Sequence, residues 1–421
     1  MTARPERPGA AQAPALFYGW VVVGGAFLVL LVAYGAQYSF GVFFSALLEE
    51  FGWSRVSLAG AFSLYAFAYC MFGFPAGRLT DRWGPRRVIA VGGVFLGGAL
   101  AGMALVTRLW QPYVLYGVVA ALGMGTAYVP CNATVVKWFV RRRGLAVGIA
   151  SSGASVGTFA LPPLAQLLVD AVGWRAAYLV FGAGVFVLLN VIALAMRRDP
   201  ESAGLHPDGA PGAPPAGAGA TAASWPIGRA VRTSTFWILW AAFAATWIPV
   251  FIPLVHVVPF SRDLGFSRLE AASVVSALGV GAVVGRLVMG AVSDRLGRRN
   301  TAAVAMALQA LAFGGFLSVS SLLTLYATAF LFGYSYGAVS TLFTAIVGDF
   351  FGREQAGALV GVLFAMAGSM GGVGPLLAGA VHDATGSYAP AFGLAAGLNV
   401  VAAALLLTCR PPRRSATLAG T

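Results

Sequence analysis

The sequence predicts an all-α membrane protein whose twelve spanning helices form two pseudo-symmetric six-helix bundles. Three observations carry this prediction: the composition, the number of apolar stretches and an internal repeat. Of the 421 residues, 59% are hydrophobic and only 10% are charged, whereas an average soluble protein carries about 25% charged residues. An apolar run of about 20 residues is long enough to cross the hydrocarbon core of a bilayer.

The apolar stretches follow one another closely, except in the middle of the chain. There are twelve: 17–45, 55–77, 88–107, 111–137, 144–170, 174–196, 235–261, 267–293, 300–319, 322–348, 354–380 and 388–409. Between the sixth and the seventh lies a segment rich in Pro, Gly and Ala, a composition that is typical of a flexible linker. We therefore expect one bundle at 1–196, a cytoplasmic linker at 197–232, and a second bundle with a short tail at 233–421.

The second half of the chain repeats motifs of the first at an offset of 213 residues. GWSR at 52–55 corresponds to GFSR at 265–268, and DRWGPRR at 81–87 corresponds to DRLGRR at 294–299. Parallel repeats of this kind place a binding site near the middle of the membrane, between the halves, and permit the halves to rock around it.

The distribution of Lys and Arg predicts the orientation. If the N-terminus is inside, 21 of the 27 basic residues lie in cytoplasmic segments and five lie outside, with Arg286 left over inside a span. By the positive-inside rule, both termini are expected in the cytoplasm. The first 15 residues lack an apolar core, so we expect no cleavable signal peptide. The net charge of +13 comes without a basic recognition module, so no nucleic-acid partner is expected.

The sequence offers no pattern of an enzyme, a cofactor site or a metal site. Cys70, Cys131 and Cys409 fall singly in apolar segments, which predicts neither a disulfide framework nor a metal cluster. Phosphate-binding loops of the GxxxxGK[ST] kind and HExxH motifs are absent from the sequence. Energy for any transport should therefore come from a gradient.

Arg286 is the only charged residue between Ala271 and Gly290. An arginine in a spanning helix costs about 2.5–3.5 kcal/mol on insertion scales and tends to face a cavity or a partner. Its planar fork matches a carboxylate, so we expect it to bind an anionic substrate. The alternative is that the side chain reaches the cytoplasmic interface roughly 10 Å away. At the repeat offset Arg286 corresponds to Gly73, so it is not part of the shared scaffold.

Polar side chains at mid-helix depth mark the rest of the expected substrate path. Phenols and amides can hydrogen-bond a hydroxy or keto group while the rings form the walls of a pocket, although each can equally bridge two helices. Helix one also carries Gln37 and Tyr38. The residues expected to contact substrate beside Arg286 are Tyr34, Tyr128, Asn132, Tyr334 and Tyr336.

The two repeated loops, at 77–87 and 290–299, resemble the hallmark loop of the major facilitator superfamily. In each, an acid beside several arginines can form a cytoplasmic charge network that breaks when the halves rock; the plainer interpretation is a positive-inside anchor. The residues expected in this network are Asp81, Arg82, Arg86, Asp294, Arg295 and Arg298.

A narrower resemblance is carried by KWFVRRRGLAVGIASSGASVG at 137–157, by Tyr18-Gly19-Trp20, and by the arginine of the eighth helix. These features are similar to the monocarboxylate transporter family and the related oxalate–formate exchangers. The resemblance implies transport of small monocarboxylates such as L-lactate or pyruvate, often with a proton. The chain lacks the long linkers and tails of many animal members, so a monomeric bacterial homologue in the inner membrane is expected.

The same resemblance implies that Asp263 pairs with Arg286 and exchanges the coupling proton; the alternative is a solvated loop acid beside Arg262. His256 titrates in the useful range when unperturbed, yet a lone histidine is more often structural. Apart from its cytoplasmic start, the eleventh segment contains no Lys or Arg, and one buried cation suits one carboxylate. The rival interpretations are an oxalate- or formate-type anion exchanger, a multidrug exporter and a membrane ligand sensor.

Overall fold

The computed structural model describes residues 17–139, 143–209, 225–351 and 356–412, and these are almost entirely helical. Within them, eleven helical segments are long and apolar enough to cross a membrane. One of the eleven runs through α8 (Arg143–Ala195) and contains Gly173 at φ 78°, a left-handed conformation that breaks the helix. When the two sides of Gly173 are counted separately, the described residues contain the twelve spans that the sequence predicts.

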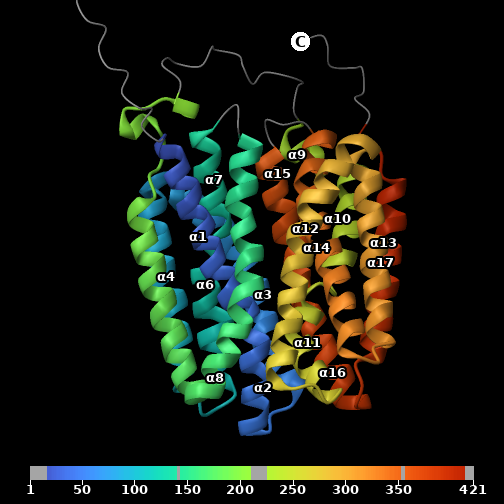
Figure 1. The fold of residues 1–421 in the computed structure, drawn as a ribbon. Helices are drawn as coiled ribbons and strands as arrows, with labels where there is room; N and C mark the ends of the chain where they lie inside the picture. The colour runs from blue at the N-terminus through green and yellow to red at the C-terminus, as the bar shows by residue number, and fades with distance from the viewer. Residues whose placement is uncertain (1–16, 140–142, 210–224, 352–355, 413–421) are drawn as a thin grey trace, which may run out of the picture.

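The spans of the first half lie on one side of the molecule and those of the second half on the other (Figure 1). Several spans are composite, because short π-helical or bent segments interrupt them. The first half contains α1 (Tyr18–Tyr38), α2 (Phe40–Phe51), α3 (Arg55–Trp83), α4 (Pro85–Met103), α5 (Trp110–Pro112), η1 (Tyr113–Ala120), α6 (Ala121–Gly125), α7 (Tyr128–Trp138) and α8.

The second half follows the short elements η2 (Glu201–Ala203), η3 (Pro207–Gly209) and α9 (Ile227–Ala230), which lie at the end of the bundle where the linker is expected. It contains α10 (Ser234–Trp247), α11 (Phe251–Asp263), α12 (Arg268–Leu296), α13 (Arg298–Leu317), α14 (Leu322–Phe351), α15 (Ala356–Leu363), η4 (Phe364–Gly368), η5 (Ser369–Gly372), α16 (Val373–Thr385) and α17 (Ala389–Thr408).

The sequence repeat is also a repeat of local structure. Ser54 caps α3 by accepting a hydrogen bond from the backbone N–H of Ser57, and Ser267 caps α12 in a capping box with Glu270. At the other end of the same helices, Gly84 and Gly297 both adopt φ 81°, which lets the chain turn directly into the next helix. Equivalent residues therefore begin and end equivalent helices in the two halves.

Glycines allow pairs of helices to approach almost to backbone contact. A Cβ placed on Gly281 or Gly285 of α12 would lie 2.2 or 1.9 Å from a carbonyl oxygen of α14. The first half uses the same device, because a Cβ on Gly153 or Gly157 of α8 would lie 2.0 or 2.1 Å from a carbonyl oxygen of α1. Helices in membranes associate through such small-residue contacts, and here they fix the position of α12.

We predict that Gly285→Ala lowers the melting temperature of the detergent-purified protein by several degrees. The added methyl carbon would clash with the carbonyl of Tyr334, and overpacking of this kind costs about 1–3 kcal/mol. Gly290→Ala on the same helix is the control, because nothing lies within 4 Å of a Cβ at that position. Equal melting temperatures for the two variants would contradict the packing argument.

Candidate functional site

Arg286 points across the seam between the two halves. Its Nη1 donates a hydrogen bond of 3.1 Å to the backbone carbonyl of Ser151 on α8. About two turns earlier on α12, a Cβ at Gly279 would lie 2.7 Å from the backbone of Phe159. One turn before that, Ser276 donates to the carbonyl of Phe159 at 2.6 Å. The close α12–α8 contact thus directs Arg286 into the other half rather than along α12 to the membrane surface.

The guanidinium of Arg286 is half-buried and is not satisfied by an acid. Across the described ranges of the chain, no carboxylate lies within ion-pair distance of it. A backbone carbonyl offers partial negative charge to one N–H, and Arg has five N–H donors. The site therefore retains a fixed positive charge with donors to spare.

A short hydrogen-bond chain extends from Arg286 into the first half. The hydroxyl of Ser151 donates to Oδ1 of Asn132 at 3.1 Å, and Nδ2 of Asn132 donates to the carbonyl of Tyr128 at 3.0 Å. The side chain of Asn132 is therefore held beside Ser151, the residue whose carbonyl accepts from Arg286.

Tyrosines from three helices surround this position. The ring of Tyr34 lies 6.2 Å from that of Tyr128 and 5.9 Å from that of Tyr38, and the hydroxyl of Tyr38 lies 2.9 Å from the hydroxyl of Tyr336. The phenols of Tyr34, Tyr38 and Tyr128 lie close enough to Arg286 for a charge–dipole interaction. Four of the five polar residues expected near Arg286 are thus brought together, and Tyr38 joins them.

Tyr334 is not part of this group. Gly281 and Gly285 pack against its backbone. Among the described residues, its hydroxyl makes no contact with the other phenols. The reason is helical geometry: Tyr334 and Tyr336 are two residues apart, so their side chains leave α14 on nearly opposite sides. Sequence position alone did not distinguish them.

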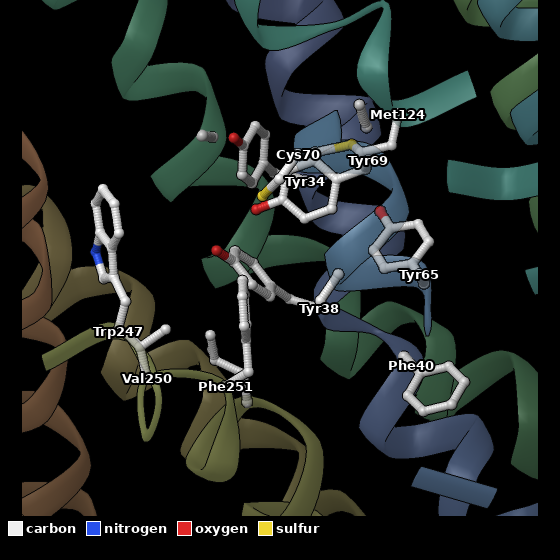
Figure 2. Close-up of a cluster of buried hydrophobic side chains, with 14 of the residues drawn as sticks. Tyr34, Tyr38, Phe40, Tyr65, Tyr69, Cys70, Met124, Trp247, Val250 and Phe251 are labelled. Carbon is white, nitrogen blue, oxygen red and sulfur yellow. The ribbon is translucent and has the colours of Figure 1, made fainter. Parts of the chain in front are cut away.

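The second half supplies an apolar wall. The ring of Phe364 lies 6.4 Å from Tyr128 and 5.4 Å from Trp247. Figure 2 shows Tyr34 and Tyr38 on one side, facing Trp247 and Phe251 on the other. One cation, several hydroxyls and aromatic walls suit a small anion that carries a short apolar or hydroxylated tail.

The expected pair between Asp263 and Arg286 is not formed. Oδ1 of Asp263 accepts a hydrogen bond of 2.7 Å from Arg55, and its Oδ2 lies 3.5 Å from Nε2 of His382. Asp263 ends α11, at the far end of the molecule from the loop after α12, so its carboxylate meets Arg55 at the start of α3 instead. This ion pair joins the two halves at the end of the bundle that the distribution of basic residues predicts to face outward.

His256 is fully buried and both ring nitrogens are occupied. Nε2 lies 2.9 Å from the carbonyl of Pro375, and Nδ1 lies 3.0 Å from the hydroxyl of Tyr388. A carbonyl only accepts, so Nε2 carries the proton and Nδ1 accepts from Tyr388. Burial raises the pKa of the Tyr388 phenol, which keeps it protonated, and Tyr388 in turn accepts from Arg55 at 2.7 Å.

Further contacts join the two halves at the same end, which we call the outer end after this prediction. The backbone N–H groups of Arg55 and Val56 donate to the carboxylate of Asp383, which caps α3 from the other half. Arg268 at the start of α12 donates to Glu49 at 2.6 Å. We refer to Arg55, Asp263, Tyr388 and Asp383 as the outer latch. Among ion pairs with both side chains described, those that join the halves lie at this end.

At the opposite end, the expected charge network is only partly visible. The side chains of Asp81 and Asp294 lie outside the described part of the structure, and Arg82, Arg86 and Arg295 are exposed. Arg298 donates to Asp349 on α14 at 2.7 Å. The expected network did not include Asp349, because its motif covers only the loop and not the neighbouring helix.

Comparison with known proteins identifies the class. The family model of the Major Facilitator Superfamily matches residues 26–260 and 250–421, so the chain belongs to this superfamily of membrane transporters and is not an enzyme. Crystal structures of a nucleoside transporter and a D-xylose–proton symporter share the fold, each with a TM-score of 0.73, at 13% and 12% identity. The match to the nucleoside transporter covers 92% of this chain and 99% of that one. The match to the symporter covers 94% of this chain and 98% of that one.

Within the superfamily, the chain belongs to the monocarboxylate transporter family. It is 32% identical to monocarboxylate transporter 11 of Homo sapiens over 94% of this chain and 83% of that protein. It is 29% identical to monocarboxylate transporter 12 of Rattus norvegicus over 95% of this chain and 87% of that protein. These matches confirm the resemblance predicted from the sequence.

We predict that Arg55→Gln loosens the outer end. Val258 is 1% exposed and lines a cavity of about 310 Å³ between α2, α8, α11 and α12. A Val258→Cys probe should therefore react several times faster with a membrane-impermeant maleimide once the outer latch is broken. The native cysteines are buried and are replaced in the test background. Arg108→Gln removes an outer arginine without a described ion pair and should leave labelling unchanged; equal rates in both variants would contradict the latch.

Proposed function

We propose that this protein is a secondary active transporter that moves a small monocarboxylate such as L-lactate or pyruvate together with a proton, by alternating access. The observation that carries the proposal is Arg286: a membrane-embedded cation at the seam, held by a carbonyl of the other half and left without an acid among the described residues. A carboxylate substrate would supply the missing negative charge through the remaining N–H donors.

Substrate size follows from the surroundings of Arg286. The eleventh span adds no second basic residue to the site, so one carboxylate is matched and a second would be buried without a counter-ion, which is costly. The hydroxyls of Tyr38 and Tyr336 suit the hydroxy or keto group of a short acid. Phe364 and Trp247 suit its apolar end.

The two halves proposed for the rocking motion are 1–196 and 233–421, connected by 197–232. The substrate would lie between them, bound to Arg286 from one half and to Tyr34 and Tyr128 from the other. We propose that the protein is a monomer in a bacterial inner membrane. Both termini would lie on the cytoplasmic side, because the basic residues are concentrated in the loops at that end.

Proton coupling is assigned to the outer latch. Asp263 holds Arg55 only while its carboxylate is charged, so a proton from the outside would remove the ion pair and release the outer ends. His256 has no free ring nitrogen and holds Tyr388 in place, so we assign it a positioning role. A low external pH would thus favour opening toward the side from which substrate and proton enter.

The first test is transport and binding by Arg286 variants. Arg286→Gln should reduce uptake of labelled L-lactate into proteoliposomes by at least tenfold, because hydrogen bonds between charged groups contribute about 1.5–3 kcal/mol and 1.4 kcal/mol is tenfold. Arg286→Lys keeps the charge but loses the planar fork of donors. Its uptake rate should therefore lie between those of the wild type and Arg286→Gln. Arg229→Gln, an exposed arginine of α9, is the matched control for loss of charge.

Ligand-induced stabilisation of the purified protein separates binding from folding in the same variants. L-lactate should raise the melting temperature of the wild type but not that of a folded Arg286→Gln protein. The proposal is refuted by wild-type uptake in that variant, and its monocarboxylate selectivity is refuted if oxalate competes more strongly than unlabelled L-lactate.

The second test concerns Asp263→Asn, which keeps the size of the side chain and removes its charge. Uptake driven by an inward proton gradient should fall to the level seen without a gradient, while exchange of labelled for unlabelled substrate persists. Glu50→Gln is the control, because Glu50 pairs with Arg175 within its own half. If Asp263→Asn uptake still responds fully to the proton gradient, this carboxylate is not the coupling group.

A further inference from the structure

A basic pocket lies at the end of the bundle predicted to be cytoplasmic, where α3 turns into α4. Its volume is about 310 Å³. Four of the residues that line it are arginines, which come from two separate stretches of the chain. The lining residues are Arg82, Trp83, Gly84, Pro85, Arg86, Arg87, Met196 and Arg198.

Three of the four arginines of this pocket have no acidic partner among the described side chains. Arg82, Arg86 and Arg87 are exposed, and within the described segments none of the three has an ion pair or a side-chain hydrogen bond. Arg198 reaches only its neighbour Asp199, at 3.5 Å. Several guanidinium groups around one pocket repel one another, so the pocket suits an anion with more than one acceptor oxygen.

The equivalent loop of the second half shows a different arrangement. There Arg298 donates to Asp349, and Arg299 donates to the carbonyl of Cys409 at 3.0 Å. The turn itself is the same, since Gly84 and Gly297 share φ 81°. The second half therefore gives Arg298 and Arg299 partners within the protein, whereas Arg86, the repeat partner of Arg299, has none among the described residues.

The pocket is held in shape by contacts behind it. Trp138 donates to the carbonyl of Arg197 at 3.2 Å, and the guanidinium of Arg197 lies over the ring of Tyr18 at 4.3 Å. Met196 is buried. These contacts fix the chain after α8, so that Arg198 is placed beside the α3–α4 turn.

Directly below the pocket, α4 and α8 present apolar side chains outward. Trp83 is 55% exposed at the pocket itself, and tryptophan is enriched at the membrane–water interface. The outward residues are Val91, Val94 and Phe95 on α4 and Val187, Leu188, Val191 and Leu194 on α8. In Figure 1, α4 lies at the edge of the bundle, so this strip faces the acyl chains of the bilayer.

We propose that this pocket binds the phosphate headgroup of an anionic phospholipid, with the acyl chains lying along α4 and the second part of α8. Basic pockets on the cytoplasmic side of membrane proteins recognise such headgroups. A free phosphate shares the charge but would gain nothing from the apolar strip. The inference does not depend on the identity of the transported acid.

The test uses the delipidated full-length protein in detergent and native mass spectrometry. The probes are phosphatidylglycerol, phosphatidylcholine of the same chain length, and inorganic phosphate. Phosphatidylglycerol should be retained in preference to the other two. Arg87→Gln with Arg198→Gln should weaken its binding by about 30-fold, because each basic residue near a membrane surface contributes about 1 kcal/mol to attraction of anionic lipid. Neither residue belongs to the proposed transport site or to the expected charge network.

Arg229→Gln with Arg232→Gln removes the same charge from two exposed arginines near α9 and should leave lipid binding unchanged. Equal weakening in both double variants would show that only net charge matters and would overturn the site. Equal retention of phosphatidylglycerol and phosphatidylcholine would also overturn it. Inorganic phosphate binding as tightly as the lipid would refute the assignment to a membrane component.

Discussion

The contact between Arg286 and the carbonyl of Ser151 is the constraint around which the rest of the structure is arranged. A charge at membrane depth must be surrounded by polar groups of the protein, and a backbone carbonyl from the opposite half supplies part of what is needed. It can do so only because Gly279 lets α12 approach α8. The same carbonyl carries only a partial negative charge, so the positive charge of Arg286 at the centre of the seam is not balanced. The surrounding phenols can orient a ligand there, but they do not neutralise the cation.

The site arises where the two halves cease to be equivalent. Caps, turns and glycine contacts recur at the repeat offset, and they build two similar scaffolds. At the position of Arg286 the first half has Gly73, which lies near Val129 and carries no charge. The cytoplasmic loops diverge in the same way, since Arg298 has an acid on α14 and the repeat partner of Arg298 is Pro85. In both places the backbone structure is repeated in the two halves, whereas the charged side chains are not.

Composition and apolar lengths were enough to predict the twelve spans, because the bilayer leaves few alternatives to a helix. They were also enough to select Arg286, since a charge in such a helix is conspicuous. The sequence could not show that Asp263 would meet Arg55 rather than Arg286, because an ion pair between distant segments depends on how the halves dock. It could not show the acceptor of Arg286 either. Every residue has a backbone carbonyl, so the residue type does not reveal that the carbonyl of Ser151 accepts this hydrogen bond. The choice between Tyr334 and Tyr336 needed the rotation of α14, which depends on the α12–α14 packing.

The outer end and the centre of the seam differ in the kind of interaction that holds them, and this difference fits the proposed opening of the two halves. The outer latch consists of half-exposed ion pairs and hydrogen bonds, and each exposed pair contributes only about 0–1 kcal/mol. Because Arg55 meets Asp263, Tyr388 and the neighbouring cap by Asp383 at one point, losing one charge weakens several contacts at once. The centre differs, because Arg286 would lose the carbonyl of Ser151 if the halves separated and would then need another acceptor. In the proposed function a bound carboxylate would provide that acceptor, so separation of the halves would be easier with a substrate than with an empty site, and transport would thereby be linked to occupancy.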